Sequence, residues 1–193
     1  MNIMKDEIIE NKIIKNEDFS NFNFSYKEIV NCKFINCNFT ECNFQESRIE
    51  STLFESCNIS NPKIDSSKLL DIKYQNCKVV GINLYKCNQI GFELYFTECK
   101  MILCNFSDMK MKKSKVIKCE LEDCYFQNTY LAEVDFEGSI FKNTLFNKTD
   151  LRKANFSNAI GYEINPIENN IKNAIFTVPE ALNLLSSFDI VIK

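Results

Sequence analysis

Residues 32–44 read CKFINCNFTECNF, and this stretch repeats one arrangement three times, a cysteine followed two positions later by a phenylalanine. The phenylalanines are Phe34, Phe39 and Phe44, so the period is five residues. Five matches neither the 3.6-residue period of an α-helix nor the two-residue alternation of a β-strand. The stretch is therefore neither an amphipathic helix nor a single strand, and it indicates an internal repeat.

The five-residue period extends over most of the chain. Every fifth residue is apolar or aromatic in two runs, one of fourteen positions from Phe19 to Leu84 and one of thirteen from Phe96 to Phe156. At this hydrophobic content, chance would give such agreement on the order of once in 10⁹. Small residues recur two positions before each central residue, and turn formers recur two positions after it. A solenoid with four pentads per coil explains all three positions, because every fifth side chain then points to the axis.

Several of these pentads resemble the unit of pentapeptide-repeat proteins, which is a small residue, Asn or Asp, Leu or Phe, and two variable residues. The clearest matches are Cys37-Asn38-Phe39, Cys57-Asn58-Ile59, Cys104-Asn105-Phe106 and Ala154-Asn155-Phe156. The resemblance covers roughly residues 19–176. It implies an all-β solenoid, a right-handed quadrilateral β-helix. We therefore expect a β-helix over residues 1–176 and a separate C-terminal module over residues 177–193.

The period breaks once, between Leu84 and Phe96, where the register advances by twelve residues instead of ten. One interpretation is a bulge, with Gly91 giving the backbone room. The other is a local protrusion that contacts a partner, since loops often carry binding residues. The candidates for that contact are Tyr85, Gln89, Phe92 and Tyr95.

The sequence pattern changes at the C-terminal end. The period continues formally at Gly161 and Pro166, which are poor inward residues, so we expect part of the last coil to loop out. Thr177 and Glu180 have the spacing of a capping box, which predicts a helix from about Val178 to Ser187. A short strand over residues 190–192 should follow. This apolar tail must cap its own core or pack against a partner, and its candidate interface residues for a dimer are Leu182, Leu184, Leu185, Phe188, Ile190 and Ile192.

The composition excludes the commonest catalytic and metal sites. The 193 residues include ten Cys but no His and no Trp, so Ser-His-Asp triads, Cys-His pairs and His-ligated zinc are impossible. All ten cysteines occupy the slot two residues before a central residue, where they interchange with Ser, Thr and Ala. We interpret them as small buried thiols of the inner wall, rather than as a Cys₄ metal site or disulfides. We expect no catalytic residue, cofactor or metal, and hence no enzyme.

The charge pattern indicates which kinds of partner the protein is expected to bind. The net charge is −3 and the isoelectric point is about 5.2, which argues against direct nucleic-acid binding. A basic band interrupts the acidic chain, and it is either a phosphate-binding patch or, more commonly, a solvated face: Lys110, Lys112, Lys113, Lys115 and Lys118. The N-terminus lacks a signal-peptide pattern and no stretch is long enough to span a bilayer, so we expect a cytoplasmic protein without a membrane partner.

The end of the chain, with its Pro-initiated, Leu-rich helix and terminal Ile-Val-Ile, resembles the tail by which Qnr-type quinolone-resistance proteins dimerise end to end. That resemblance implies binding to the type II topoisomerases, DNA gyrase and topoisomerase IV, and relief of quinolone inhibition. In that family the acidic rod is proposed to imitate duplex DNA. The large projecting loops of many such proteins have no counterpart here. We expect a homodimer that binds type II topoisomerase, and the alternative is a repeat scaffold that binds another protein.

Overall fold

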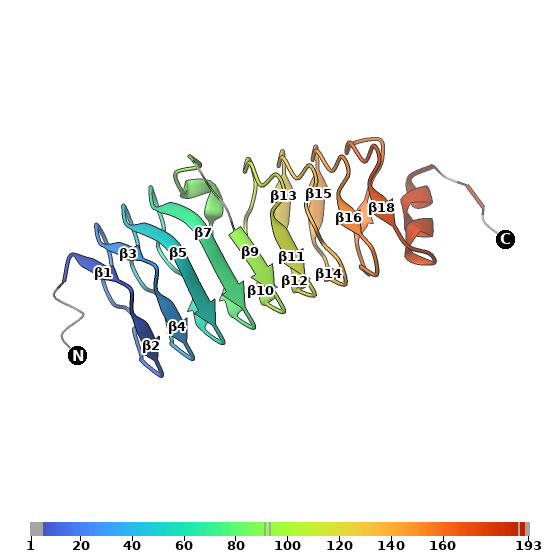
Figure 1. The fold of residues 1–193 in the computed structure, drawn as a ribbon. Helices are drawn as coiled ribbons and strands as arrows, with labels where there is room; N and C mark the ends of the chain where they lie inside the picture. Colours follow the sequence, from blue (N-terminus) through green and yellow to red (C-terminus); the bar gives the residue numbers. More distant parts are fainter. Residues whose placement is uncertain (1–5, 91, 93, 189, 192–193) are drawn as a thin grey trace.

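The computed structural model describes residues 6–90, 92, 94–188 and 190–191, and these residues form a long four-sided rod (Figure 1). The rod is a right-handed β-helix in which each coil stacks on the preceding one through parallel strands. This confirms the all-β solenoid expected from the five-residue period. No helix within the described residues is long and apolar enough to cross a membrane.

The parallel strands fall into four sets, of which the first covers two adjacent sides of the rod and the fourth continues the side of β11. The longest set is joined by pairing along the rod: β1 (Ile8–Glu10), β2 (Ile13–Lys15), β3 (Glu28–Val30), β4 (Lys33–Ile35), β5 (Arg48–Glu55), β7 (Lys68–Gln75), β9 (Leu94–Thr97) and β11 (Lys115–Ile117). The second set consists of β6 (Asn58–Ser60), β8 (Lys78–Val80), β10 (Lys100–Ile102), β12 (Glu120–Glu122) and β14 (Ile140–Lys142). The third consists of β13 (Tyr125–Gln127), β15 (Leu145–Asn147) and β17 (Glu163–Ile164), and the fourth of β16 (Asn155–Phe156) and β18 (Ile175–Phe176). Isolated bridges such as Asp18 to Asn38 continue the sides where no strand is formed.

The turn-forming residues of the sequence lie at the corners of the coils. A residue with positive φ recurs at nearly every corner, from +46° at Ser51 to +63° at Lys113 among the non-glycine residues. Asn, Asp and Gly tolerate this left-handed conformation better than other residues, which accounts for their recurrence two positions after the inward residue. Corner side chains also bond between coils, since the Asn31 amide nitrogen donates to the Asn11 amide oxygen at 2.6 Å.

The inward side chains form one continuous core along the axis. The rings of Phe106 and Phe126 stack at 4.7 Å and those of Phe126 and Phe146 at 5.1 Å, both nearly parallel. The core begins earlier than the run that starts at Phe19, because Ile9 and Ile14 are also inward and buried. Stacking of inward apolar side chains therefore spans the rod from its first coil.

The break in the period is a two-residue insertion, as the sequence predicts. Lys68 pairs with Asn88, twenty residues later, whereas Ile72 pairs with Leu94, twenty-two residues later. The extra residues therefore lie between Asn88 and Leu94. Just before them the chain forms the short 3₁₀ helix η2 (Leu84–Lys86), and this region projects from the rod in Figure 1.

The last coil departs from the five-residue period. Leu145 pairs with Glu163, eighteen residues later, and Asp150 pairs with Asn170, twenty residues later. The inward positions are therefore taken by Tyr162 and Ile164, which are buried, rather than by Gly161 and Pro166. The extra two residues are accommodated between Ile164 and Asn170, so the expected looping out occurs there.

The C-terminal helix exists but differs in detail from the sequence prediction. It is a 3₁₀ helix, η3 (Glu180–Phe188), rather than a helix over residues 178–187, and it lies against the end of the rod (Figure 1). The predicted capping box is wrong. Thr177 Oγ1 instead accepts a hydrogen bond from the Asn158 backbone N–H at 3.0 Å, and Glu180 Oε1 accepts one from the Gly161 N–H at 2.6 Å. These side chains thus supply acceptors to the last coil, which has no further coil above it.

The predicted terminal strand is also wrong in the part that is described. Ile190 and Val191 belong to no strand, and both side chains are exposed. Ile192 lies outside the described residues. Without a neighbouring coil at this end of the chain, these residues have no strand to pair with.

The central stack predicts a strong dependence of stability on Phe126. Replacing Phe126 with Ala removes the ring between Phe106 and Phe146, and we expect a loss of about 3–5 kcal/mol in the free energy of unfolding. The matched control is Tyr125→Ala on the same strand, whose side chain points outward, with an expected loss of about 0.5 kcal/mol or less. Urea unfolding measures both, and equal losses would contradict the assigned direction of the two side chains.

Candidate functional site

The ten cysteines form part of the inner wall, and all are free and buried. Five of them follow one line of the rod, one per coil, and the line continues across the insertion: Cys37, Cys57, Cys77, Cys99 and Cys119. Their thiols interact with main-chain carbonyls, as at Cys57 Sγ and Phe34 O, 3.5 Å apart. Burial raises the pKa of Cys42 to about 12 and that of Cys87 to about 11. These two thiols are therefore protonated at neutral pH, which disfavours both nucleophilic attack and metal ligation.

No cluster of three or more side chains that could hold a metal ion occurs in the described part of the chain. The carboxylates, which are the remaining candidates for acid–base chemistry, point outward and many are paired with cations. Glu120 contacts both Lys100 and Lys142, and hydrogen bonds from these lysines lower its pKa. Such exposed, paired carboxylates lack the desolvated cleft that acid–base catalysis uses.

The four residues predicted as partner contacts near the insertion do not form one surface. Tyr85 is exposed, but Phe92 has only 8% of its surface accessible and belongs to the core. The prediction that Phe92 contacts a partner is therefore wrong, because its ring packs in the core beside the insertion. Tyr95 lies in strand β9 with Lys73 Nζ 5.9 Å from its ring centroid. Ile90, which the sequence reasoning omitted, is the most exposed of this group at 82%.

Gln89 has a structural role that its sequence position did not suggest. Its amide nitrogen donates to the Asp108 carbonyl at 3.2 Å, and its amide oxygen accepts from the Lys110 N–H at 3.2 Å. A single side chain therefore joins two coils where the insertion interrupts the backbone ladder. Its hydrogen-bonding groups are used within the protein, so Gln89 is a poor candidate for a partner contact.

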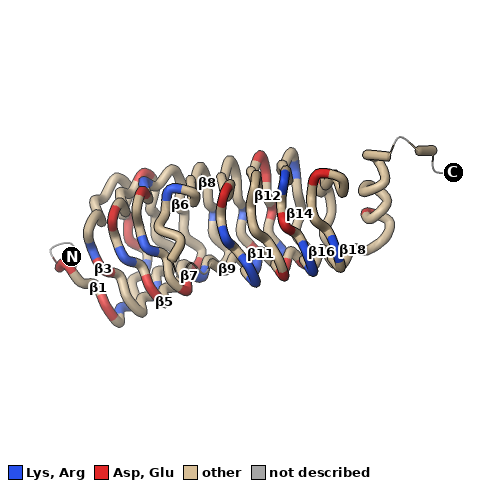
Figure 2. Tube along the Cα trace, turned by 90° about the horizontal axis from the view of Figure 1, so that it is seen from above, with Lys and Arg blue, Asp and Glu red and all other residues tan. Residues whose placement is uncertain are grey.

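Acidic and basic residues are mixed along the rod (Figure 2). Ion pairs join neighbouring coils or neighbouring positions, for example Lys33 with Glu55 at 2.6 Å and Lys86 with Asp65 at 3.4 Å. The basic band lies in one coil, and Lys112 and Lys113 both contact Glu133 in the next. Acidic and basic side chains are therefore interleaved, and the charges of the described residues form no unbroken acidic stripe.

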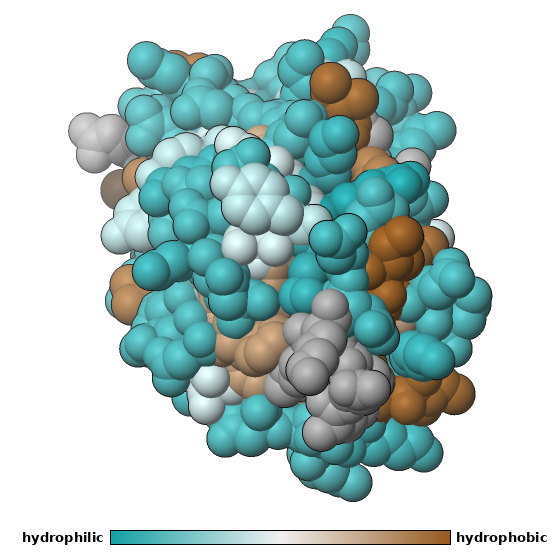
Figure 3. Space-filling model, turned by 90° about the vertical axis from the view of Figure 1, so that its left-hand side faces the viewer, coloured by the Kyte–Doolittle hydropathy of each residue, from teal (hydrophilic) through white to brown (hydrophobic). Residues whose placement is uncertain are grey.

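Exposed hydrophobic side chains are concentrated toward the C-terminal end. Nine of the sixteen large ones lie at or after Leu145: Leu145, Ile160, Ile167, Ile175, Val178, Leu182, Phe188, Ile190 and Val191. By contrast, the end view from the N-terminal coil is mainly hydrophilic, with hydrophobic side chains in small separate groups (Figure 3). We call Leu182, Phe188, Ile190 and Val191 the C-terminal apolar segment. Of the other predicted interface residues, Leu184 packs on the core and Leu185 is half-buried.

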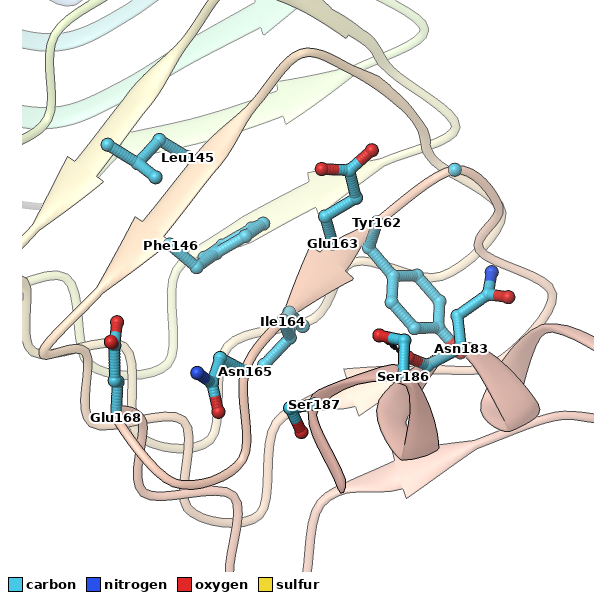
Figure 4. A pocket seen from close by; sticks show the side chains of 11 residues that line it. Leu145, Phe146, Tyr162, Glu163, Ile164, Asn165, Glu168, Asn183, Ser186 and Ser187 are labelled. Atoms are coloured by element: carbon cyan, nitrogen blue, oxygen red, sulfur yellow. Dashed lines mark hydrogen bonds between the residues drawn. The ribbon is translucent and has the colours of Figure 1, made fainter. Parts of the chain in front are cut away.

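A groove of about 610 Å³ lies between η3 and the end of the rod at β15 and β17 (Figure 4). Its floor contains Phe146, Tyr162 and Ile164, which are buried, and Glu163 and Glu168 are exposed beside it. The sequence did not predict this groove, because the groove depends on the altered register of the last coil and on the position of η3. It lies next to the C-terminal apolar segment, because η3 contributes residues to both.

Comparisons with known proteins agree with the geometry. The family model for the pentapeptide repeat region matches residues 27–100. The family model for pentapeptide repeats, which contains eight copies, matches residues 119–158. The comparison with curated proteins yields no match. Among solved structures, the chain is similar to a trypsin-treated variant of QnrB1, a plasmid-mediated fluoroquinolone resistance protein, with 15% identity, a TM-score of 0.65, and coverage of 96% of this chain and 99% of that one. It is also similar to full-length QnrB1, with 14% identity, a TM-score of 0.50, and coverage of 95% and 99%.

The buried thiols predict low reactivity in the folded protein. We expect Ellman's reagent to react with few or none of the ten cysteines under native conditions and with all ten in denaturant, because the reagent cannot enter the packed core. Ser51→Cys, at an exposed corner, provides a control thiol that should react at once. Rapid reaction of several native thiols would show that the inner wall is open.

Proposed function

This chain belongs to the pentapeptide-repeat proteins, and from that membership we propose that it acts by binding another protein, with type II DNA topoisomerase as the first candidate. The observation that carries the proposal is the similarity of this fold to a trypsin-treated variant of QnrB1, a fluoroquinolone resistance protein. The similarity covers 96% of this chain and 99% of that one. The C-terminal tail adds to it, because it has the Pro-initiated helix that suggested Qnr-type proteins. Binding would modulate the action of quinolone-like inhibitors on the enzyme.

The rod would bind through shape and local surface groups rather than as a copy of duplex DNA. A DNA mimic needs a regular array of negative charge, since duplex DNA carries one charge per about 1.7 Å of its axis. Here basic residues lie among the acidic ones, as Lys100 and Lys142 do on both sides of Glu120. Imitation of the negative charge of duplex DNA is therefore not part of the proposed mechanism.

We further propose that the C-terminal apolar segment mediates a homodimer. An isologous contact would bring Leu182 and Phe188 of one copy against the same segment of the other about a two-fold axis. Both side chains are about half exposed in the single chain, although η3 contributes Leu184 to the core beneath it. Burial of such a segment is the usual reason for an apolar surface at the end of a solenoid.

A second candidate function is a scaffold for a different protein. The projecting region around the insertion favours it, because Tyr85 and Ile90 are exposed there beside η2. A pull-down from a bacterial lysate distinguishes the two candidates if the variant Tyr85→Ser/Ile90→Ser is compared with the native chain. Loss of one specific protein other than a topoisomerase would favour the scaffold.

The topoisomerase proposal predicts an effect on gyrase itself. We expect the native protein, titrated into a supercoiling reaction with ciprofloxacin, to restore supercoiled product, because its binding would displace or destabilise the inhibited complex. The same titration with protein unfolded by heat serves as the control. Neither rescue nor inhibition over a wide concentration range would exclude gyrase as the partner, and the same assay with topoisomerase IV would complete the test.

The dimer proposal predicts that Leu182→Asp gives a monomer. The new carboxylate would be buried without a partner in the interface, whereas in the single chain it remains in water, so the variant should still fold. Ile90→Asp, at another exposed aliphatic side chain that is distant from η3 in the sequence, is the control. Light scattering that gives one unchanged mass for the native chain and both variants would contradict a dimer through this segment.

A further inference from the structure

The C-terminal half of the rod carries its positive charge mainly on one side. That side consists of four segments in successive coils, aligned by the bridges from Lys110 to Tyr130, from Tyr130 to Asp150 and from Asp150 to Asn170. We call them together the basic side: residues 108–113, 128–133, 148–153 and 170–173. They contain seven Lys or Arg against three Asp or Glu, a net charge of +4, whereas the remaining residues from 114 to 169 contain three against seven, a net charge of −4. The net charge of the whole chain, −3, averages over this separation and therefore does not reveal it.

The three acids of the basic side are already bound by neighbouring side chains. Asp108 accepts a hydrogen bond from the Asn128 amide nitrogen at 2.7 Å, and Glu133 contacts two lysines of the preceding coil. Asp150 forms an ion pair with the Arg152 guanidinium at 2.6 Å. Four lysines remain exposed and form no ion pair with a described residue: Lys110, Lys148, Lys153 and Lys172. These four ammonium groups are therefore available to an external anion.

The basic side is short, and the same side of the rod is acidic nearer the N-terminus. Successive coils are about 4.8 Å apart, so the four segments span about 14 Å along the axis. In the first four coils the corresponding segments contain three cations and seven acids: residues 6–11, 26–31, 46–51 and 66–71. A long polyanion that lay along the rod would therefore reach an acidic surface, whereas one that crosses the rod at the basic side would not.

The composition of the basic side favours a nucleic-acid backbone over a protein partner. None of the exposed large hydrophobic side chains lies within its four segments, all of whose residues are described. Protein interfaces are usually centred on such anchors and are depleted in lysine, whereas lysine commonly contacts phosphate oxygens. Its single aromatic residue, Tyr130, is partly buried and interacts with Arg152, so it offers no free ring on which an unpaired base could stack. A duplex therefore fits better than a single strand.

We propose that the basic side binds the phosphate backbone of duplex DNA that crosses the rod, and that its four unpaired lysines are the phosphate contacts. The ammonium group of lysine acts as a point charge, and its contacts with phosphate do not depend on the base sequence. Each contact releases counterions from the DNA, which favours binding and makes it sensitive to salt. This proposal goes beyond the protein partner proposed above and does not rest on it.

The first experiment measures the fluorescence anisotropy of a labelled duplex of mixed sequence, about two helical turns long, as the full chain is added. We expect binding at about 50 mM NaCl that becomes on the order of a hundredfold weaker at about 200 mM, because four phosphate contacts give a salt slope of about −3.6. A duplex of unrelated sequence should bind with the same affinity. Absence of binding at about 100 μM protein in the low-salt buffer overturns the proposal, as does a strong preference for one sequence.

The variant Lys153→Gln/Lys172→Gln tests the position of the site. We expect at least about tenfold weaker binding in the low-salt buffer and a salt slope that is smaller in magnitude by about 1.8, because two phosphate contacts are lost. Lys63→Gln/Lys118→Gln is the matched control, because these lysines are also exposed, form no ion pair with a described residue and lie outside the basic side. If the control weakens binding as much, the DNA is held only by general charge attraction and the proposal fails.

Competition against the labelled duplex distinguishes the classes of polyanion. The competitors are the unlabelled duplex, single-stranded DNA of the same sequence and poly-L-glutamate, compared at equal concentrations of negative charge. We expect the duplex to compete best. Stronger competition by poly-L-glutamate would assign the basic side to an acidic protein, stronger competition by the single strand would assign it to unpaired nucleic acid, and either result overturns the proposal. No topoisomerase is present in these assays, so their failure would leave the topoisomerase proposal unaffected.

Discussion

The contact of each inward side chain with the inward side chain of the neighbouring coil is the interaction on which the rest of the solenoid depends. Phe126 shows it most clearly, because its ring lies between those of Phe106 and Phe146. A column this narrow leaves room only for small side chains beside it, and cysteine fills that position without an unpaired polar group. The chain must then turn within each pentad, which requires positive φ at the corners.

Where the regular coils are interrupted, polar side chains form hydrogen bonds with the backbone groups that lack a partner in the ladder. At the insertion, the Gln89 amide joins its own coil to Asp108 and Lys110. At the end of the rod, Thr177 and Glu180 accept hydrogen bonds from main-chain N–H groups that no further coil can satisfy. Both cases follow from the same rule, that a backbone polar group removed from water needs a partner. Polar residues near irregular pentads are therefore better explained by structure than by partner binding.

The sequence was sufficient where the repeat is regular and insufficient where it is not. The five-residue spacing predicted the inward direction of Phe126 and the common environment of all ten cysteines. It could not predict that Phe92 or Tyr162 points inward, because an added or missing pair of residues changes which side chain next faces the axis. The capping box failed for a related reason. Thr177 and Glu180 had alternative donors in Asn158 and Gly161, and each of these lies nineteen residues earlier in the chain.

The sequence by itself determined the four-sided solenoid, its core column and the position of the insertion, because a local period repeated through most of the chain allows only one way to bury its apolar residues. Only the tertiary structure decided which charges lie side by side, since neighbours on the surface are about twenty residues apart and the spacing changes twice. The groove beneath η3 and the unpaired hydroxyl of Tyr162 likewise arise where the last coil meets the helix. No sequence period extends across that junction, so its geometry depends on packing alone.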